Sequence, residues 1–206
     1  MHGLIARTLQ CFLQDTYGQA AWQDIAGRSG LDLPGFEAML DYETGLVVRV
    51  LSEATALLAK PADTILEDIG TYLITHANNE GLRRLMRYGG VDFIDFLHSL
   101  EELPGRARLA VPDLRLPDLE LEGHSGRAFC LRCTAPTGEP TGFGHVLVGV
   151  LRAMADDYGA LVILDHRGAE AGCETVDIVV IQTDFASGRA FELGAPLPVP
   201  RASSIP

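Results

Sequence analysis

Residues 91–117 read VDFIDFLHSLEELPGRARLAVPDLRLP, and this stretch decides the fold because it joins an amphipathic helix to an extended connection marked by prolines. Asp92 is placed to cap the helix. Proline removes a backbone donor and clashes with the preceding turn, so Pro104 and Gly105 are expected to end the helix. Its inward face is formed by apolar side chains at helical spacing, namely Phe93, Phe96, Leu97, Leu100 and Leu103.

Upstream of this stretch, apolar residues recur every three or four positions, which predicts helices. Thr64 and Glu67 match the Ser/Thr-x-x-Glu pattern of a capping box, so one helix is expected to begin at Thr64. Gly70 lies within that helix at a cost of about 1 kcal/mol relative to alanine, which indicates close approach of another backbone or of a flat ligand. Further helices are expected over residues 1–17, around Trp22, and over residues 47–60 and 81–88.

After Pro117 the pattern changes to short β-rich segments bounded by glycine or polar residues. Four strands are expected in LELEG, RAFCLRC, ALVILDH and TVDIVVIQ, with a helix over residues 142–159 between the second and the third. Helices followed by strand, strand, helix, strand and strand imply an α+β fold with a small antiparallel sheet. The tail, residues 183–206, is rich in proline and small residues and is expected to be flexible.

The composition argues against several classes of function. The 206 residues carry a net charge of −12, which argues against nucleic-acid binding because phosphate contacts need clustered Lys and Arg. No apolar run approaches the roughly 18–20 residues that span a bilayer. No signal peptide is recognisable, so a cytoplasmic protein is expected. No Ser-His-Asp order, phosphate loop or metal-ligand helix motif is found, so we do not expect an enzyme.

Four cysteines in a chain of this length do not indicate a disulfide framework. Cys130 and Cys133 form a Cys-x-x-Cys pair, a pattern that can bind zinc or cycle between redox states. The pair lies in a predicted strand, where residues three apart point to opposite faces. We therefore interpret both cysteines as structural or incidental.

Several segments together resemble the heme nitric oxide/oxygen binding (H-NOX) family of sensor domains, which also supplies the regulatory heme domain of soluble guanylate cyclase. These segments are MHGLI, LQCFLQDTYGQAAWQDI, LEDIGTYLI, GLRRLMRYGGVDFIDFLHSLEEL and VPDLRLPDLELE. The resemblance covers residues 1–182. It implies an α+β fold in which a helical subdomain, about residues 1–60, packs on an α/β subdomain, about residues 61–182, with a tetrapyrrole pocket between them.

The sequence departs from this family at the groups that hold heme. In the family a histidine within Leu-Asp-x-Leu-His coordinates the iron, and the matching segment here ends in Pro104, which has no nitrogen able to coordinate iron. The family's Tyr-x-Ser-x-Arg anchor for the heme propionates corresponds to Cys133, Ala135 and Thr137. Charge-assisted hydrogen bonds worth roughly 1.5–3 kcal/mol each are therefore expected to be lost.

The resemblance still implies an apolar pocket. Ile5 and Leu9 would line one face of a flat ligand, and Pro117 would press on the other. The pocket candidates are Ile5, Leu9, Gly70, Leu73, Leu100, Pro104, Pro117, Cys133, Val146 and Val150.

Two histidines are weak candidates for a substitute iron ligand. His98 is nearest, but it precedes Pro104 by six residues and so lies about 120° away around a helix. His145 would lie on the opposite side of the pocket, either as a distal ligand or gate or as a solvent-facing residue.

These observations favour an H-NOX-like sensory protein that lacks histidine-ligated heme and binds another hydrophobic or flat ligand, or a protein partner. One alternative is a heme-based nitric oxide or oxygen sensor with a non-standard axial ligand. Another is a heme-free regulatory subunit whose own side chains fill the pocket. The resemblance implies a separate signalling protein as partner, either a kinase or a cyclic-nucleotide enzyme.

Overall fold

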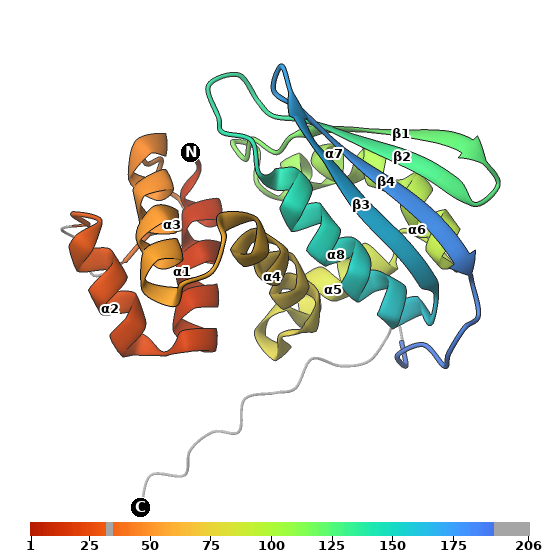
Figure 1. The fold of residues 1–206 in the computed structure, drawn as a ribbon, viewed down its shortest axis with the longest axis horizontal. Helices are drawn as coiled ribbons and strands as arrows, with labels where there is room; N and C mark the ends of the chain where they lie inside the picture. The colour runs from red at the N-terminus through yellow and green to blue at the C-terminus, as the bar shows by residue number, and fades with distance from the viewer. Residues whose placement is uncertain (32–34, 192–206) are drawn as a thin grey trace, which may run out of the picture.

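The computed structural model describes residues 1–31 and 35–191, which form two parts connected through one helix (Figure 1). The first part, here the helical half, consists of α1 (Gly3–Tyr17), α2 (Gln19–Arg28) and α3 (Thr44–Leu58). The connecting helix is α4 (Ala62–Thr75). The second part, here the sheet half, contains η1 (Ala77–Asn79), α5 (Glu80–Arg87), α6 (Phe93–Ser99), η2 (Leu100–Glu102), α7 (Leu103–Ala110), β1 (Asp118–Ser125), β2 (Ala128–Thr134), α8 (Phe143–Tyr158), β3 (Leu161–Glu170) and β4 (Cys173–Gln182).

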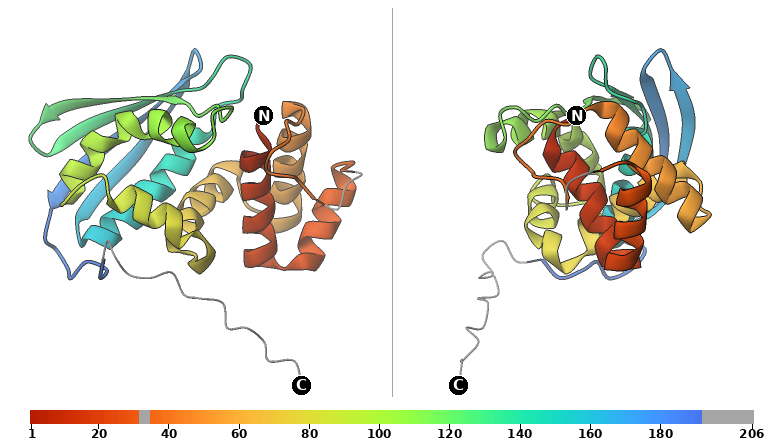
Figure 2. Two further views of the ribbon diagram at one scale, coloured as in Figure 1. Left: turned by 180° about the vertical axis from the view of Figure 1, so that it is seen from behind. Right: turned by 90° about the vertical axis from the view of Figure 1, so that its left-hand side faces the viewer.

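The sheet half is built on four antiparallel strands in the order β1-β2-β4-β3, which confirms the predicted α+β fold. Buried and exposed residues alternate along β2 and β4 because successive side chains point to opposite faces. Cys133 is buried on the inner face and Cys130 lies on the other face, as predicted. α6 and α8 cover the inner face, and none of the helices in residues 1–31 and 35–191 covers the opposite face (Figure 2).

Two hydrophobic clusters form the cores, and α4 contributes to both. Ile65 and Ile69 pack with the helical half, whereas Ile74 packs with the sheet half. Trp22 is 1% exposed and packs in the core of the helical half. Leu4 on α1 is exposed, whereas Leu9 and Phe12 on the same helix are buried. Because α4 belongs to both cores, a shift of this helix would change the packing in both halves.

The structure corrects the sequence prediction at two helix boundaries. α4 begins at Ala62 with Pro61 as its N-cap, so Thr64 lies inside the helix and the predicted capping box is wrong. Pro104 does not end the helical stretch either: α6 ends at Ser99, a 3-10 turn follows, and α7 carries Pro104 in its first turn. Proline suits that position because the first N–H groups of a helix have no helical partner.

α4 and α8 cross at two glycines. A Cβ built on Gly70 would lie 2.0 Å from the Val146 carbonyl oxygen, and one built on Gly149 would lie 1.9 Å from the Glu67 carbonyl oxygen. Any larger residue would drive the helices apart, so glycine is required on both sides. The close approach predicted at Gly70 is made by the backbone of α8.

Two segments outside the helices and strands make further tertiary contacts. Glu139, in the loop between β2 and α8, accepts a hydrogen bond from Thr44 of the helical half at 3.1 Å. Residues 183–191, within the tail that we expected to be flexible, return to the end of α8, where the Ala186 amide donates to the Gly159 carbonyl. The remaining tail, residues 192–206, lies outside the described residues. Among the described residues, no helix has the length and apolar character needed to cross a membrane.

Candidate functional site

The predicted pocket residues fall into two groups. Leu73 packs against the core of the helical half, but Ile5 on α1 and Val146 on α8 are partly buried and belong to neither core cluster. These two apolar side chains come from opposite halves of the molecule. The buried candidates are Leu9, Gly70, Leu100, Pro104, Pro117, Cys133 and Val150.

Pro104 is buried in the first turn of α7, next to the 3-10 turn that contains Leu100. Leu100 is 1% exposed and belongs to the core of the sheet half. The helix therefore keeps its apolar face, but the position that the H-NOX resemblance assigns to the iron ligand carries a ring without a free nitrogen lone pair.

Cys133 is poorly suited to replace that ligand. It is fully buried on the inner face of β2, and burial, with a smaller effect of the Glu174 carboxylate, raises the pKa of its thiol to about 12. A thiol binds metal as the thiolate, so burial disfavours the form of Cys133 that would coordinate iron. Ala135 is partly buried, Thr137 is exposed, and neither offers a charged donor for a propionate.

His98 lies on the outer side of α6. Its ring is exposed and contacts the edge of Phe129, with ring centroids 5.7 Å apart. It also lines an open surface pocket of about 660 Å³ together with Arg87 and Glu102. A smaller pocket of about 150 Å³ lies between α4 and α8, near Asp157. Neither of these two pockets is lined by any of the ten predicted pocket residues. At the position that the resemblance assigns to the iron ligand, Pro104 offers no donor atom to a heme iron.

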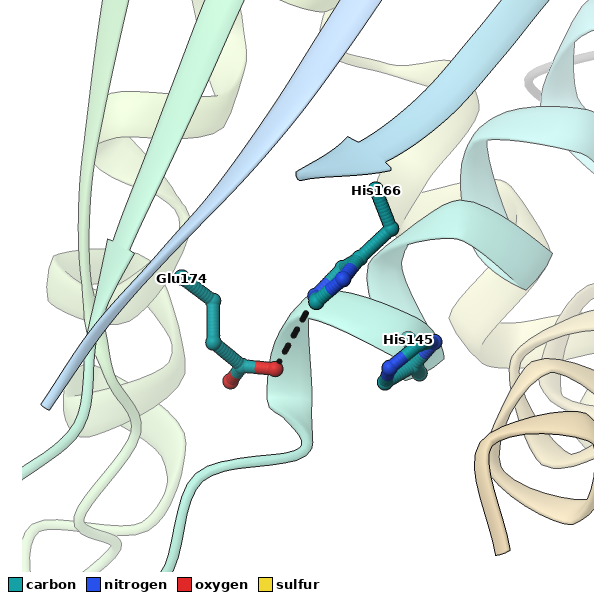
Figure 3. A group of neighbouring side chains, drawn as sticks. All are labelled: His145, His166 and Glu174. Atoms are coloured by element: carbon teal, nitrogen blue, oxygen red, sulfur yellow. Dashed lines mark hydrogen bonds and ion pairs between the residues drawn. The ribbon is translucent and has the colours of Figure 1, made fainter. Parts of the chain in front are cut away.

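A different set of potential ligands gathers where α8 meets the sheet (Figure 3). His145 lies in the first turn of α8, His166 on β3 and Glu174 on β4. The two imidazole rings stack with centroids 3.8 Å apart and planes inclined by 21°. His166 Nε2 lies 3.1 Å from Glu174 Oε1. One ligand atom from each of the three residues lies within 4.8 Å of the other two.

Both ends of this cluster are held by further groups. Glu174 is 2% exposed, and its Oε2 accepts the backbone N–H groups of Gly142 at 2.7 Å and Gly144 at 3.1 Å. At the other end, His145 Nδ1 lies 3.5 Å from Glu67 Oε1 on α4. The cluster therefore joins α4, α8 and two strands.

The sequence only partly indicates this cluster. We expected His166 to end a strand, but β3 continues to Glu170 and His166 lies inside it. Strand alternation could have placed His166 and Glu174 on the inner face, since each continues the inward series of its strand. No local pattern predicts that His145 stacks on His166, because that contact depends on how α8 packs against the sheet.

Curated relatives of this chain include soluble guanylate cyclases. Soluble guanylate cyclase gcy-31 of Caenorhabditis elegans is 23% identical over 157 residues, covering 76% of this chain and 22% of the relative. Soluble guanylate cyclase 89Da of Drosophila melanogaster is 21% identical over 192 residues, covering 92% of this chain and 26% of the relative. The chain thus spans about a quarter of the length of these relatives.

Solved structures show the same fold. An H-NOX protein mutant from K. algicida superposes with a TM-score of 0.72 at 18% identity, covering 88% of this chain and 97% of that chain. An H-NOX protein from S. oneidensis in the Fe(II)NO ligation state gives a TM-score of 0.71 at 14% identity, covering 87% and 99%. These similarities establish the arrangement of helices and strands.

A family model described as Haem-NO-binding matches residues 2–166. The match runs from the first residues of the helical half through α8 and into β3, and it includes both Pro104 and His145. With the shared fold, this match identifies the chain as a member of the haem-NO-binding family.

Proposed function

We propose that this chain is a sensory, ligand-binding domain of the haem-NO-binding family that works without histidine-ligated heme. The observation that carries the proposal is Pro104, a buried proline in the first turn of α7, at the position that the family resemblance assigns to the iron ligand. Proline offers no lone pair to iron, and Cys133 is held as a neutral thiol by burial.

The loss of the propionate anchors supports the same conclusion. Cys133, Ala135 and Thr137 stand where the family pattern has two hydroxyls and a guanidinium. Each charge-assisted hydrogen bond is worth roughly 1.5–3 kcal/mol, so the combined loss would weaken heme binding by orders of magnitude.

A hydrophobic or flat ligand suits the residues that remain. Ile5 and Val146 are apolar, partly accessible and not taken up by either core, and Pro117 is retained as a buried residue. In this proposal such a ligand, or a protein partner, acts between the halves and shifts α6 and α7. The output would pass to a separate signalling protein, a kinase or a cyclic-nucleotide enzyme, consistent with the guanylate cyclase relatives.

Adding hemin to the purified full chain and recording its visible spectrum tests this proposal. We expect no saturable Soret band. A stoichiometric Soret band that shifts on addition of nitric oxide would contradict it. Native mass spectrometry of freshly purified protein, compared with the denatured mass, would detect a co-purified ligand.

Two variants test the alternative that this chain is a heme sensor with another axial ligand. If hemin does bind, His98→Ala and His145→Ala identify the ligand, because removing the true ligand abolishes the band. A band that survives both substitutions would exclude these two histidines.

A further inference from the structure

We propose that His145, His166 and Glu174 form a binding site for a divalent transition-metal ion. Two imidazoles and one carboxylate are a donor set that zinc and related first-row ions bind, with open positions left for water. The three side chains come from α8, β3 and β4, and one ligand atom of each lies within 4.8 Å of the others. The tertiary fold thus assembles the set from separate elements (Figure 3).

The surroundings of the Glu174 carboxylate favour binding of a cation. Its carboxylate is almost fully buried, and both backbone N–H bonds are made to Oε2, so Oε1 faces the two histidines. A buried carboxylate is costly unless it is hydrogen-bonded or paired with a cation. The first turn of α8 leaves no space for a side chain beside it: a Cβ on Gly144 would lie 2.7 Å from His166 Nε2 and 2.9 Å from the Glu174 Cβ.

His145 has the outer partner that metal-binding histidines usually have. Such a histidine directs its second ring N–H to a carboxylate, which fixes the ring and increases its basicity. His145 Nδ1 is buried without a hydrogen-bond partner and points to Glu67 Oε1 at 3.5 Å, slightly too far for a good hydrogen bond. Arg152 holds the other oxygen of Glu67 at 2.9 Å. Nε2 of His145 then remains as the ligand atom.

Coordination requires two local changes. Lone pairs lie in the ring planes, so stacked rings cannot both point at one ion, and His145, 22% exposed, has to turn out of the stack. His166 has to release the proton that Nε2 shares with Glu174, since metals bind the deprotonated nitrogen. Its proton would then sit on Nδ1, which now accepts the Gly168 N–H at 3.1 Å, so that exposed hydrogen bond would be lost.

A metal ion at this site would connect elements of both halves of the molecule. An ion held by these residues would fasten α8 to β3 and β4, and Glu67 would extend the connection to α4. α4 is the helix that belongs to both cores. The site is separate from Pro104, so its existence does not depend on whether the apolar pocket binds a ligand.

Zinc titration of the full chain by isothermal calorimetry, after removal of metal with a chelator, tests this proposal. We expect saturation at one zinc ion per chain, and a cobalt(II) derivative with visible absorption bands. His145→Ala and His166→Ala should each weaken binding by at least about tenfold, and Glu67→Gln, an outer-partner change, by about tenfold. His98→Ala and His124→Ala, both exposed and outside the cluster, are matched controls that should leave affinity unchanged.

Circular dichroism on the same samples separates loss of binding from loss of folding. If Glu174→Gln unfolds the protein, the two histidine variants and Glu67→Gln still decide the question. Absence of saturable zinc binding by the unmodified chain would overturn the proposal. Equal affinity of the unmodified chain and both histidine variants would overturn it as well.

Discussion

The predicted pocket and the His145 cluster both involve residues of α4 and α8, but their chemistry differs. On α8, His145 turns to His166, whereas the backbone of the next residue, Val146, contacts Gly70. The predicted pocket presents apolar side chains and Pro104, and the cluster presents two imidazoles and a carboxylate. The comparison teaches that the groups able to bind a metal have a different location in this chain from the one that its family resemblance predicts.

Both regions depend on the crossing of α4 and α8, so disrupting the crossing should have the largest effect. Gly149→Ala places a Cβ 1.9 Å from a backbone oxygen that cannot move without shifting α4. We expect a loss of about 3 kcal/mol in the free energy of unfolding, measured by urea denaturation. Gly81→Ala is the matched control, because its Cβ would meet nothing within 4 Å. Equal stability of both variants would contradict the account of the crossing.

Cys133 provides a pH test of the predicted pocket. Burial raises its pKa to about 12 from the usual 9.0, so the folded state holds a proton that the unfolded state releases above about pH 9. The contribution of the Cys133 thiol to the free energy of unfolding is therefore fully present below pH 9. It is lost as the pH rises toward 12, by up to about 1.4 kcal/mol per pH unit.

Cys133→Val should flatten this alkaline loss in urea denaturation between pH 8.5 and 10.5. Cys130→Val should reduce it less, because Cys130 is only partly buried, although burial raises the pKa of its thiol as well. The interpretation of Cys133 as a neutral thiol would be wrong if both variants followed the unmodified chain.

A smaller effect distinguishes the two predicted helix starts. Asp92 accepts the Asp95 N–H as the N-cap of α6, so Asp92→Ala should cost about 1 kcal/mol. Thr64 lies inside α4, so Thr64→Ala should change stability by less than about 0.5 kcal/mol. Thermal melts of the two variants check that Asp92→Ala loses more stability than Thr64→Ala. A larger loss for Thr64→Ala would instead support the predicted capping box.

These cases show which features can be predicted from the sequence and which cannot. Period-two and helical patterns predict the four strands, α8 and the opposite directions of Cys130 and Cys133, because those patterns follow from local geometry. The prediction failed at Pro104 because proline is compatible with the first turn of a new helix as well as with the end of an old one. It missed the cluster because the contact between His145 and His166 exists only after α8 packs on the sheet.

The central claim is that proline at position 104 leaves this chain without an axial ligand for heme. One measurement tests this claim directly. Visible spectra of the unmodified chain and of Pro104→His are compared with equimolar hemin, before and after addition of nitric oxide. We predict that Pro104→His acquires a Soret band that responds to nitric oxide while the unmodified chain does not. A nitric oxide-responsive band of equal intensity in both proteins would contradict the account.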